Sequence, residues 1–208
     1  MNSRRFQIGY RIDDVGASGI SRVELFITQS DGKKWYKYGE DADRTSPFEV
    51  EVPSDGRYGF MLRAHSGLGL ASLPPQPGDN PAISVIVDKT PPIVELLPVQ
   101  QGRGDQLHKL SIRWKVTDDY PTEKPIALSY STDPNGPWEP ITGWISDSGS
   151  FLWTTGPGMP SKLYIRLTAR DAAGNMTRTA STDPVIVDFS KPAARIVDVE
   201  PIESFRIR

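Results

Sequence analysis

The sequence predicts an all-β protein built from two tandem antiparallel β-sandwiches. A strand-and-turn pattern occurs twice, at residues 57–69 and 162–174, with an apolar side chain at every second position in both copies. No segment combines a helical period with capping signals. The chain has 208 residues, which is enough for two domains of about 100 residues each, a common size for a β-sandwich.

Alternating apolar residues predict five strands in the first half of the chain. Asp31-Gly32 is the strongest hairpin signal between them, because this dipeptide tolerates the positive φ of a tight turn. The strands are marked by Phe6, Ile8, Tyr10 and Ile12, by Val23, Leu25 and Ile27, by Phe48, Val50 and Val52, by Tyr58, Phe60, Leu62 and Ala64, and by Ile83, Val85 and Val87.

The second half repeats these strands in the same order, with Asn135-Gly136 as its strongest hairpin signal. An additional leading strand, residues 93–97, follows the Pro91-Pro92 pair and has no counterpart at the start of the chain. The repeated strands are marked by Leu110, Ile112, Trp114 and Val116, by Ile126, Leu128 and Tyr130, by Phe151 and Trp153, by Leu163, Ile165, Leu167 and Ala169, and by Val185 and Val187.

The ends of the repeats define the expected domains. We expect a first domain at residues 1–88 that lacks its first strand, and a second domain at residues 89–190. Residues 191–208 form a C-terminal tail, in which Ala194 to Val199 have the pattern of the leading strand of a third repeat. This tail is suited to fill the open edge of the first domain, within the chain or in a neighbouring molecule.

Composition narrows the possible partners and compartments. Lys and Arg number 24 against 26 acidic residues, so no surplus of positive charge indicates nucleic acid or anionic lipid. No apolar run of membrane-spanning length is present, so we expect no direct membrane insertion. The absence of cysteine excludes a disulfide framework. Strand patterns at both ends of the sequence lead us to expect a piece of a longer exported protein, extracellular or at the cell surface.

Motifs near the end of each repeat resemble bacterial immunoglobulin-like domains of the Big type, which are similar to fibronectin III domains. The second copy carries an Asp-x-x-Gly-Asn hairpin at residues 171–175, and Val-Asp-x-Thr-x-Pro stands at residues 87–92. The first copy departs from the pattern at residues 65–69, and the linker at residues 187–192 is degraded. The resemblance implies two tandem immunoglobulin-like sandwiches that serve as spacer or binding modules of large surface or secreted proteins.

Four aspartates are the candidate metal ligands. In an immunoglobulin-like topology, the linker that enters a unit lies at the same end as its B–C and F–G loops, so Asp88 should approach Asp118, Asp119 and Asp171. Converging carboxylates without basic partners suit calcium, which takes about 6 to 8 oxygen ligands. Calcium is the only cofactor that the sequence suggests. The alternative is that these side chains cap turns by accepting backbone N–H bonds.

Aromatic residues of the second copy are the candidate ligand-binding residues. Trp138, Trp144 and Tyr130 lie close together in the sequence, and exposed rings on a β-sandwich stack on sugars or hold peptides. The alternative is burial in the core, where Trp35, Trp114 and Trp153 are in register with core-facing positions. Residues 103–105 spell Arg-Gly-Asp, an adhesion tripeptide that also fits an ordinary flexible turn.

The sequence offers no catalytic constellation. Its two histidines, His65 and His108, belong to different units, and no nucleophile elbow or phosphate-binding loop is present. We therefore expect a non-catalytic spacer or interaction module whose partners are other repeats of the same polypeptide and a protein or glycan ligand. The alternatives are an accessory, carbohydrate-binding-like domain pair of a secreted hydrolase and an intracellular scaffold.

Overall fold

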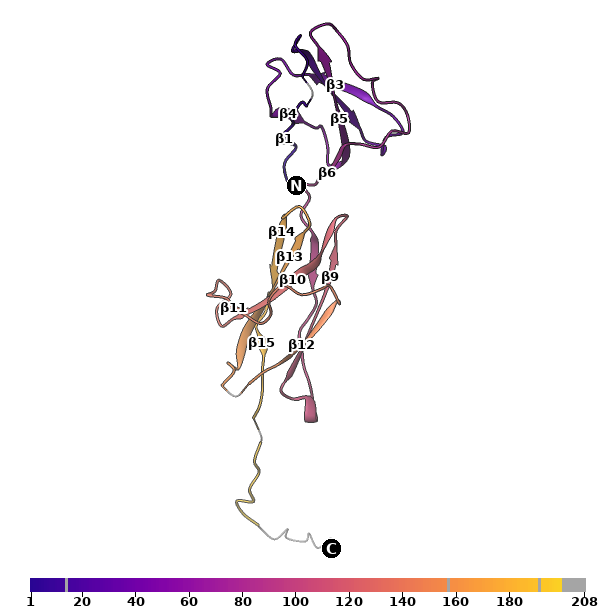
Figure 1. The fold of residues 1–208 in the computed structure, drawn as a ribbon. Helices are drawn as coiled ribbons and strands as arrows, with labels where there is room; N and C mark the ends of the chain where they lie inside the picture. Colours follow the sequence, from indigo (N-terminus) through magenta and orange to yellow (C-terminus); the bar gives the residue numbers. More distant parts are fainter. Residues whose placement is uncertain (14, 157, 191, 200–208) are drawn as a thin grey trace, which may run out of the picture.

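The computed structural model describes residues 1–13, 15–156, 158–190 and 192–199, which form two tandem immunoglobulin-like antiparallel β-sandwiches (Figure 1). The predicted all-β fold is confirmed. Among the described residues the only helical element is the short 3₁₀ helix η1 (Gly104–Gln106), and no helix could cross a membrane.

The first sandwich is built from six strands in two sheets. A sheet of β1 and β4 faces a sheet with the order β3-β2-β5-β6. Side chains from both sheets fill the core, including Leu25, Phe48, Val50, Tyr58 and Phe60. The strands are β1 (Arg5–Ile8), β2 (Ile20–Thr28), β3 (Tyr36–Glu40), β4 (Phe48–Glu51), β5 (Gly56–Ser66) and β6 (Ile83–Val87).

The second sandwich follows the same plan with an added edge. Strand β9 pairs with β12 on one side and with β7 and β8 on the other, while the facing sheet has the order β11-β10-β13-β14, with β15 also on β13. The strands are β7 (Ile93–Leu96), β8 (Gln100–Gln101), β9 (Lys109–Thr117), β10 (Pro121–Ser131), β11 (Glu139–Pro140), β12 (Ser150–Thr154), β13 (Lys162–Asp171), β14 (Met176–Ala180) and β15 (Val185–Ile186).

The first predicted strand is shorter than its sequence pattern. Apolar alternation continues to Ile12, but β1 ends at Ile8. Its counterpart β9 continues to Thr117 because β7 pairs with the whole end of that strand. Among the described residues, β1 pairs only with β4. In the described part of the chain, no strand takes the position equivalent to β7 and pairs with residues 9–13.

One turn and the tail complete the comparison with the sequence. Asp31 and Gly32 both have positive φ, at 50° and 85°, as expected for the hairpin between β2 and β3. Residues 192–199 are exposed, form no strand, and extend away from the second sandwich (Figure 1). The strand pattern at residues 204–208 lies outside the described residues.

Candidate functional site

Three of the four predicted metal ligands meet where the two sandwiches join. Asp88 follows β6, Asp118 follows β9, and Asp171 ends β13. One carboxylate oxygen from each lies within 4.8 Å of the others. Asp88 and Asp171 are each only 3% exposed. The expected convergence of the linker with the two loops therefore occurs.

The three carboxylates are held by neutral donors. Asn175 donates its backbone N–H and its side-chain amide to Asp171, at 2.8 and 2.6 Å. The backbone N–H of Thr90 donates to Asp88 at 2.9 Å, and that of Tyr120 donates to Asp118 at 2.8 Å. Within the described part of the chain, none of the three acids forms an ion pair. Among the residues that the structure describes, hydrogen-bond dipoles compensate their charges and no cation does.

The lack of compensation is reflected in the pKa of Asp118. Burial raises the pKa of this carboxyl above its ordinary value, and the nearby charges of Asp171, Asp88 and Asp119 raise it further. A divalent cation between the carboxylates would offset both the desolvation of Asp118 and its repulsion by the neighbouring aspartates, because the cation supplies the missing positive charge. Three carboxylates provide only part of a calcium shell, so backbone oxygens or water would complete it.

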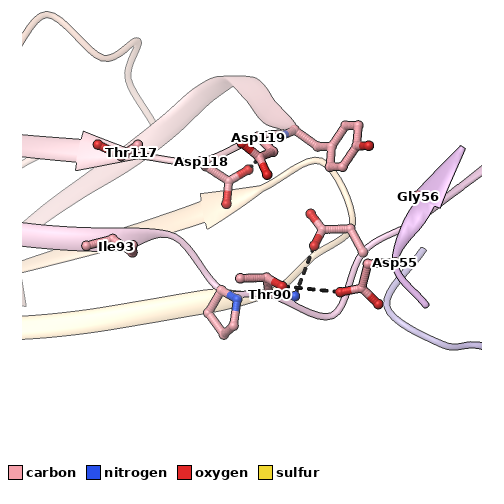
Figure 2. A pocket seen from close by; sticks show the side chains of 10 residues that line it. Asp55, Gly56, Thr90, Ile93, Thr117, Asp118 and Asp119 are labelled. Atoms are coloured by element: carbon pink, nitrogen blue, oxygen red, sulfur yellow. Dashed lines mark hydrogen bonds between the residues drawn. The ribbon is translucent and has the colours of Figure 1, made fainter.

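A cavity of about 210 Å³ opens beside this acid cluster (Figure 2). Asp119 lines the cavity and is exposed, and it is not a member of the close group of three. Asp118 and Asp119 lie on one side of the cavity in Figure 2, and Asp55 and Thr90 lie on the other. The fourth predicted ligand thus lies at the rim of the site.

Asp55 is a residue of this junction that the sequence interpretation missed. It precedes β5 in the first sandwich, and it accepts hydrogen bonds from the backbone N–H of Lys89 at 2.9 Å and from the Thr90 hydroxyl at 3.2 Å. Arg4 pairs with it at 2.9 Å. The Lys89 N–H, followed by Arg4 and Thr90, lowers the pKa of this carboxyl. The Ser54-Asp55-Gly56 turn, at the end of the first sandwich where the chain leaves, was the available signal.

The second sandwich holds the other side of the linker. The Asn175 side chain donates to the backbone oxygen of Asp88 at 2.9 Å, and the Thr177 hydroxyl donates to the backbone oxygen of Pro92 at 2.6 Å. The backbone N–H of Asp88 donates to the backbone oxygen of Met1 at 2.9 Å. The linker is therefore bonded to both sandwiches, in addition to the φ restriction that proline imposes.

The predicted aromatic ligand-binding residues do not form one platform. The Arg166 guanidinium lies 4.5 Å from the Trp138 ring centre, and Arg170 lies 4.0 Å from the Trp144 ring centre. Tyr130 packs against the core and Trp153 instead. An arginine thus occupies one face of each indole, and stacking of a ligand on that face would require the guanidinium to leave.

The remaining candidates lie apart from the junction. Arg103-Gly104-Asp105 is exposed at the start of η1, and His108 stacks on Phe189. His65 is buried beside Glu24, with 2.8 Å between His65 Nε2 and a Glu24 carboxylate oxygen. The sequence interpretation missed this Glu24 network. Lys37 is the main cause that lowers the pKa of Glu24 to about 2.

Comparison with known proteins finds similarity to solved structures. No family model matches the chain, and no curated protein matches it. The FN1–FN3 domains of chicken CNTN1 are 12% identical over 86% of this chain and 63% of that chain, with a TM-score of 0.36. A tetra-tandem repeat from the extending region of a large adhesion protein is 20% identical, covering 83% and 43%, with a TM-score of 0.34.

A third structure, a DUF3823 family protein from Bacteroides ovatus ATCC 8483, is 15% identical over 89% of this chain and 100% of that chain, with a TM-score of 0.32. This chain spans less than two thirds of the CNTN1 and adhesion-protein structures. At these scores the similarities add nothing to the fold that the strand pairing itself shows.

Proposed function

We propose that this chain is a non-catalytic spacer and interaction module that holds two sandwiches in a fixed orientation. One observation supports the proposal most: the linker is hydrogen-bonded by Asp55 from the first sandwich and by Asn175 and Thr177 from the second. A flexible connection would leave these linker groups to water. The first unit comprises residues 1–88 and the second residues 89–190.

The acid cluster is proposed to bind calcium as part of this function. Asp88 belongs to the linker, whereas Asp118 and Asp171 belong to the second sandwich. A cation shared by the three would therefore tie the linker to the second sandwich, while Asp55 ties it to the first. Asp119 at the rim would contribute through its charge or through a water ligand.

The setting of the proposed module is the extracellular or cell-surface part of a longer protein, and its first partners are neighbouring repeats. The free faces of both sandwiches remain for a protein or glycan ligand. Restricting the junction suits such a role, because a stiff spacer presents a distant ligand-binding part at a defined distance.

Small-angle scattering of the intact chain and of an Asp55→Ala variant tests the spacer function. The intact chain should scatter as one elongated particle, and Asp55→Ala should broaden its range of dimensions, because Lys89 and Thr90 lose their acceptor. Asp105→Ala, an exposed acid in η1, is the matched control. Equal flexibility of the intact chain and Asp55→Ala would contradict the proposal.

A further inference from the structure

The two sandwiches carry different charges on the outer face of their corresponding sheets. Strand β2 pairs with β5 in the first sandwich as β10 pairs with β13 in the second. Glu24 in β2 and Ala127 in β10 occupy the same place, because each precedes a leucine that lies opposite a leucine of the partner strand. The first sandwich thus has a carboxylate where the second has a methyl group.

Glu24 neutralises the cations on this face of the first sandwich. Its carboxylate accepts hydrogen bonds from Lys37 Nζ at 2.8 Å and from Arg63 Nη1 at 3.3 Å. Glu24 itself is only 4% exposed. The basic side chains therefore surround a carboxylate that belongs to the sheet.

The second sandwich presents arginines on the same face without such a carboxylate. Arg166 and Arg170 alternate with inward-facing residues of β13, and Arg178 in β14 lies opposite Thr168, between them. Within the described residues, none of the three arginines forms an ion pair. Burial, followed by the charge of Arg178, lowers the pKa of Arg166. Arg166 and Arg178 therefore repel each other.

The side chain of Arg166 is held in position. Its Nε donates to the Ser129 hydroxyl at 3.2 Å, and its guanidinium lies 4.5 Å from the Trp138 ring centre. The terminal nitrogens of Arg166 have no acceptor among the described residues. Glu139 follows Trp138 in the sequence, but it accepts a hydrogen bond from Tyr130 on the inner side of the sheet. A fixed guanidinium with unused N–H groups beside a second arginine suits an oxyanion such as a carboxylate or a sulfate.

A second arginine–tryptophan pair extends this face along β13. Arg170 lies 4.0 Å from the Trp144 ring centre. Arg166 and Arg170 are about 13 Å apart along the strand, at roughly 3.3 Å per residue. Trp138 and Trp144 are each half-buried, so part of each indole stays in contact with solvent. A polymer with repeated oxyanions and apolar ring faces matches both pairs, whereas an acidic peptide supplies carboxylates without the rings.

We propose that the outer face of β10, β13 and β14 binds an acidic polysaccharide, with its carboxylate or sulfate groups on Arg166 and Arg178 (Figure 1). The sugar rings would contact the solvent-exposed parts of Trp138 and Trp144. Such a site would define the glycan ligand of the proposed interaction module, and it rests on that function. It does not depend on how the linker is held, so the binding site and the fixed junction can fail separately.

Ala127→Glu is the most specific variant, because it gives the second sandwich the carboxylate that Glu24 supplies in the first. The new carboxylate should pair with the arginines and compete with the ligand, raising the dissociation constant by about tenfold or more while every arginine remains. Arg166→Gln and Arg178→Gln should each weaken binding by a similar factor. Arg103→Gln removes an exposed charge away from this face and is the matched control, which should bind as the parent does.

Calorimetric titration of the full chain with polygalacturonate, heparin, polyglutamate and neutral dextran tests the proposal, with chelator present to keep calcium from bridging carboxylates. We expect polygalacturonate or heparin to bind, with an affinity that falls as salt rises, and polyglutamate and dextran to bind far more weakly. Binding of neither acidic polysaccharide, equal binding of polyglutamate or dextran, or unchanged affinity in Ala127→Glu and Arg166→Gln would overturn the proposal. Small-angle scattering of Ala127→Glu should match the parent chain, which separates loss of the ligand site from a loosened junction.

Discussion

Replacing Asp118 by Asn should have opposite effects with and without calcium. In chelator, the substitution removes one of three charges within 4.8 Å of each other and keeps an oxygen that can accept the Tyr120 N–H. Asp118→Asn should therefore melt at a higher temperature than the parent chain. With calcium at about 100 times its dissociation constant, the parent gains roughly 2.7 kcal/mol, which is about 10 °C or more for a sandwich of this size.

The variant should lose most of this calcium-dependent rise, because a neutral amide is a weaker ligand than a carboxylate. Asp105→Asn is the matched control, since Asp105 is exposed in η1 and lies outside the close group, and it should change both melting temperatures little. Calorimetry in calcium and in excess chelator provides the data. Superimposed melting curves for the parent in the two buffers would refute the metal site.

The pH dependence in chelator follows from the raised pKa of Asp118. Because its pKa is higher in the folded state than the ordinary value of 3.8, the stability that this group contributes is fully present below 3.8 and is lost as pH rises through the folded-state pKa. The advantage of Asp118→Asn over the parent should therefore disappear in acid. An advantage that persists at low pH would mean that charge repulsion is not its cause.

Three further predictions concern stability, and calorimetry or denaturant unfolding checks each. The pKa of Glu24 is lowered to about 2, so its contribution to stability is present above 4.5 and lost as pH falls towards 2. Glu24→Gln should cost about 1–3 kcal/mol at neutral pH, because the Lys37 and Arg22 side chains are 43% and 45% exposed and remain hydrated. Unchanged stability would exclude the network as a stabilising element. Gly32→Ala should destabilise the first sandwich by about 1 kcal/mol or more, because φ at this position is 85° and an added Cβ would clash with the Asp79 backbone oxygen. An unchanged stability would contradict the turn conformation at Gly32. Arg170→Met should lower the free energy of unfolding by about 0.5–1 kcal/mol, because it removes the cation from the Trp144 ring. Equal stability would show that this contact does not stabilise the protein.

The sequence predicted the strands with clear alternation and missed those without it. Leu25 and Leu62, which pair across β2 and β5, belong to runs in which the buried face is plain from the residue order. Strand β3 reads Tyr-Lys-Tyr-Gly-Glu and has no buried residue. It is a strand because it pairs with β2, and its own sequence pattern does not predict it. Strand β11, at Glu139–Pro140, is too short to show a period.

The acid cluster at the junction was also predicted only in part, because topology places some of its residues and side-chain conformation places the others. Topology alone brings Asp88, Asp118 and Asp171 to one end of the second sandwich, so the sequence interpretation could anticipate their approach. Asp55 lies in a loop of the other sandwich, and only the relative position of the two units reveals its contact with Thr90. The Arg170 contact with Trp144 depends on side-chain conformation, which a strand pattern does not specify.

A distance measurement across the junction tests the central claim most directly. The chain has no cysteine, so Tyr36→Cys in β3 and Leu152→Cys in β12, both exposed positions, provide unique attachment sites for spin labels. Pulsed electron resonance should give one narrow distance distribution between the labels with calcium bound, and Asp55→Ala should broaden it. A broad distribution for the parent chain in calcium, equal to that of Asp55→Ala, would contradict a fixed orientation of the two sandwiches.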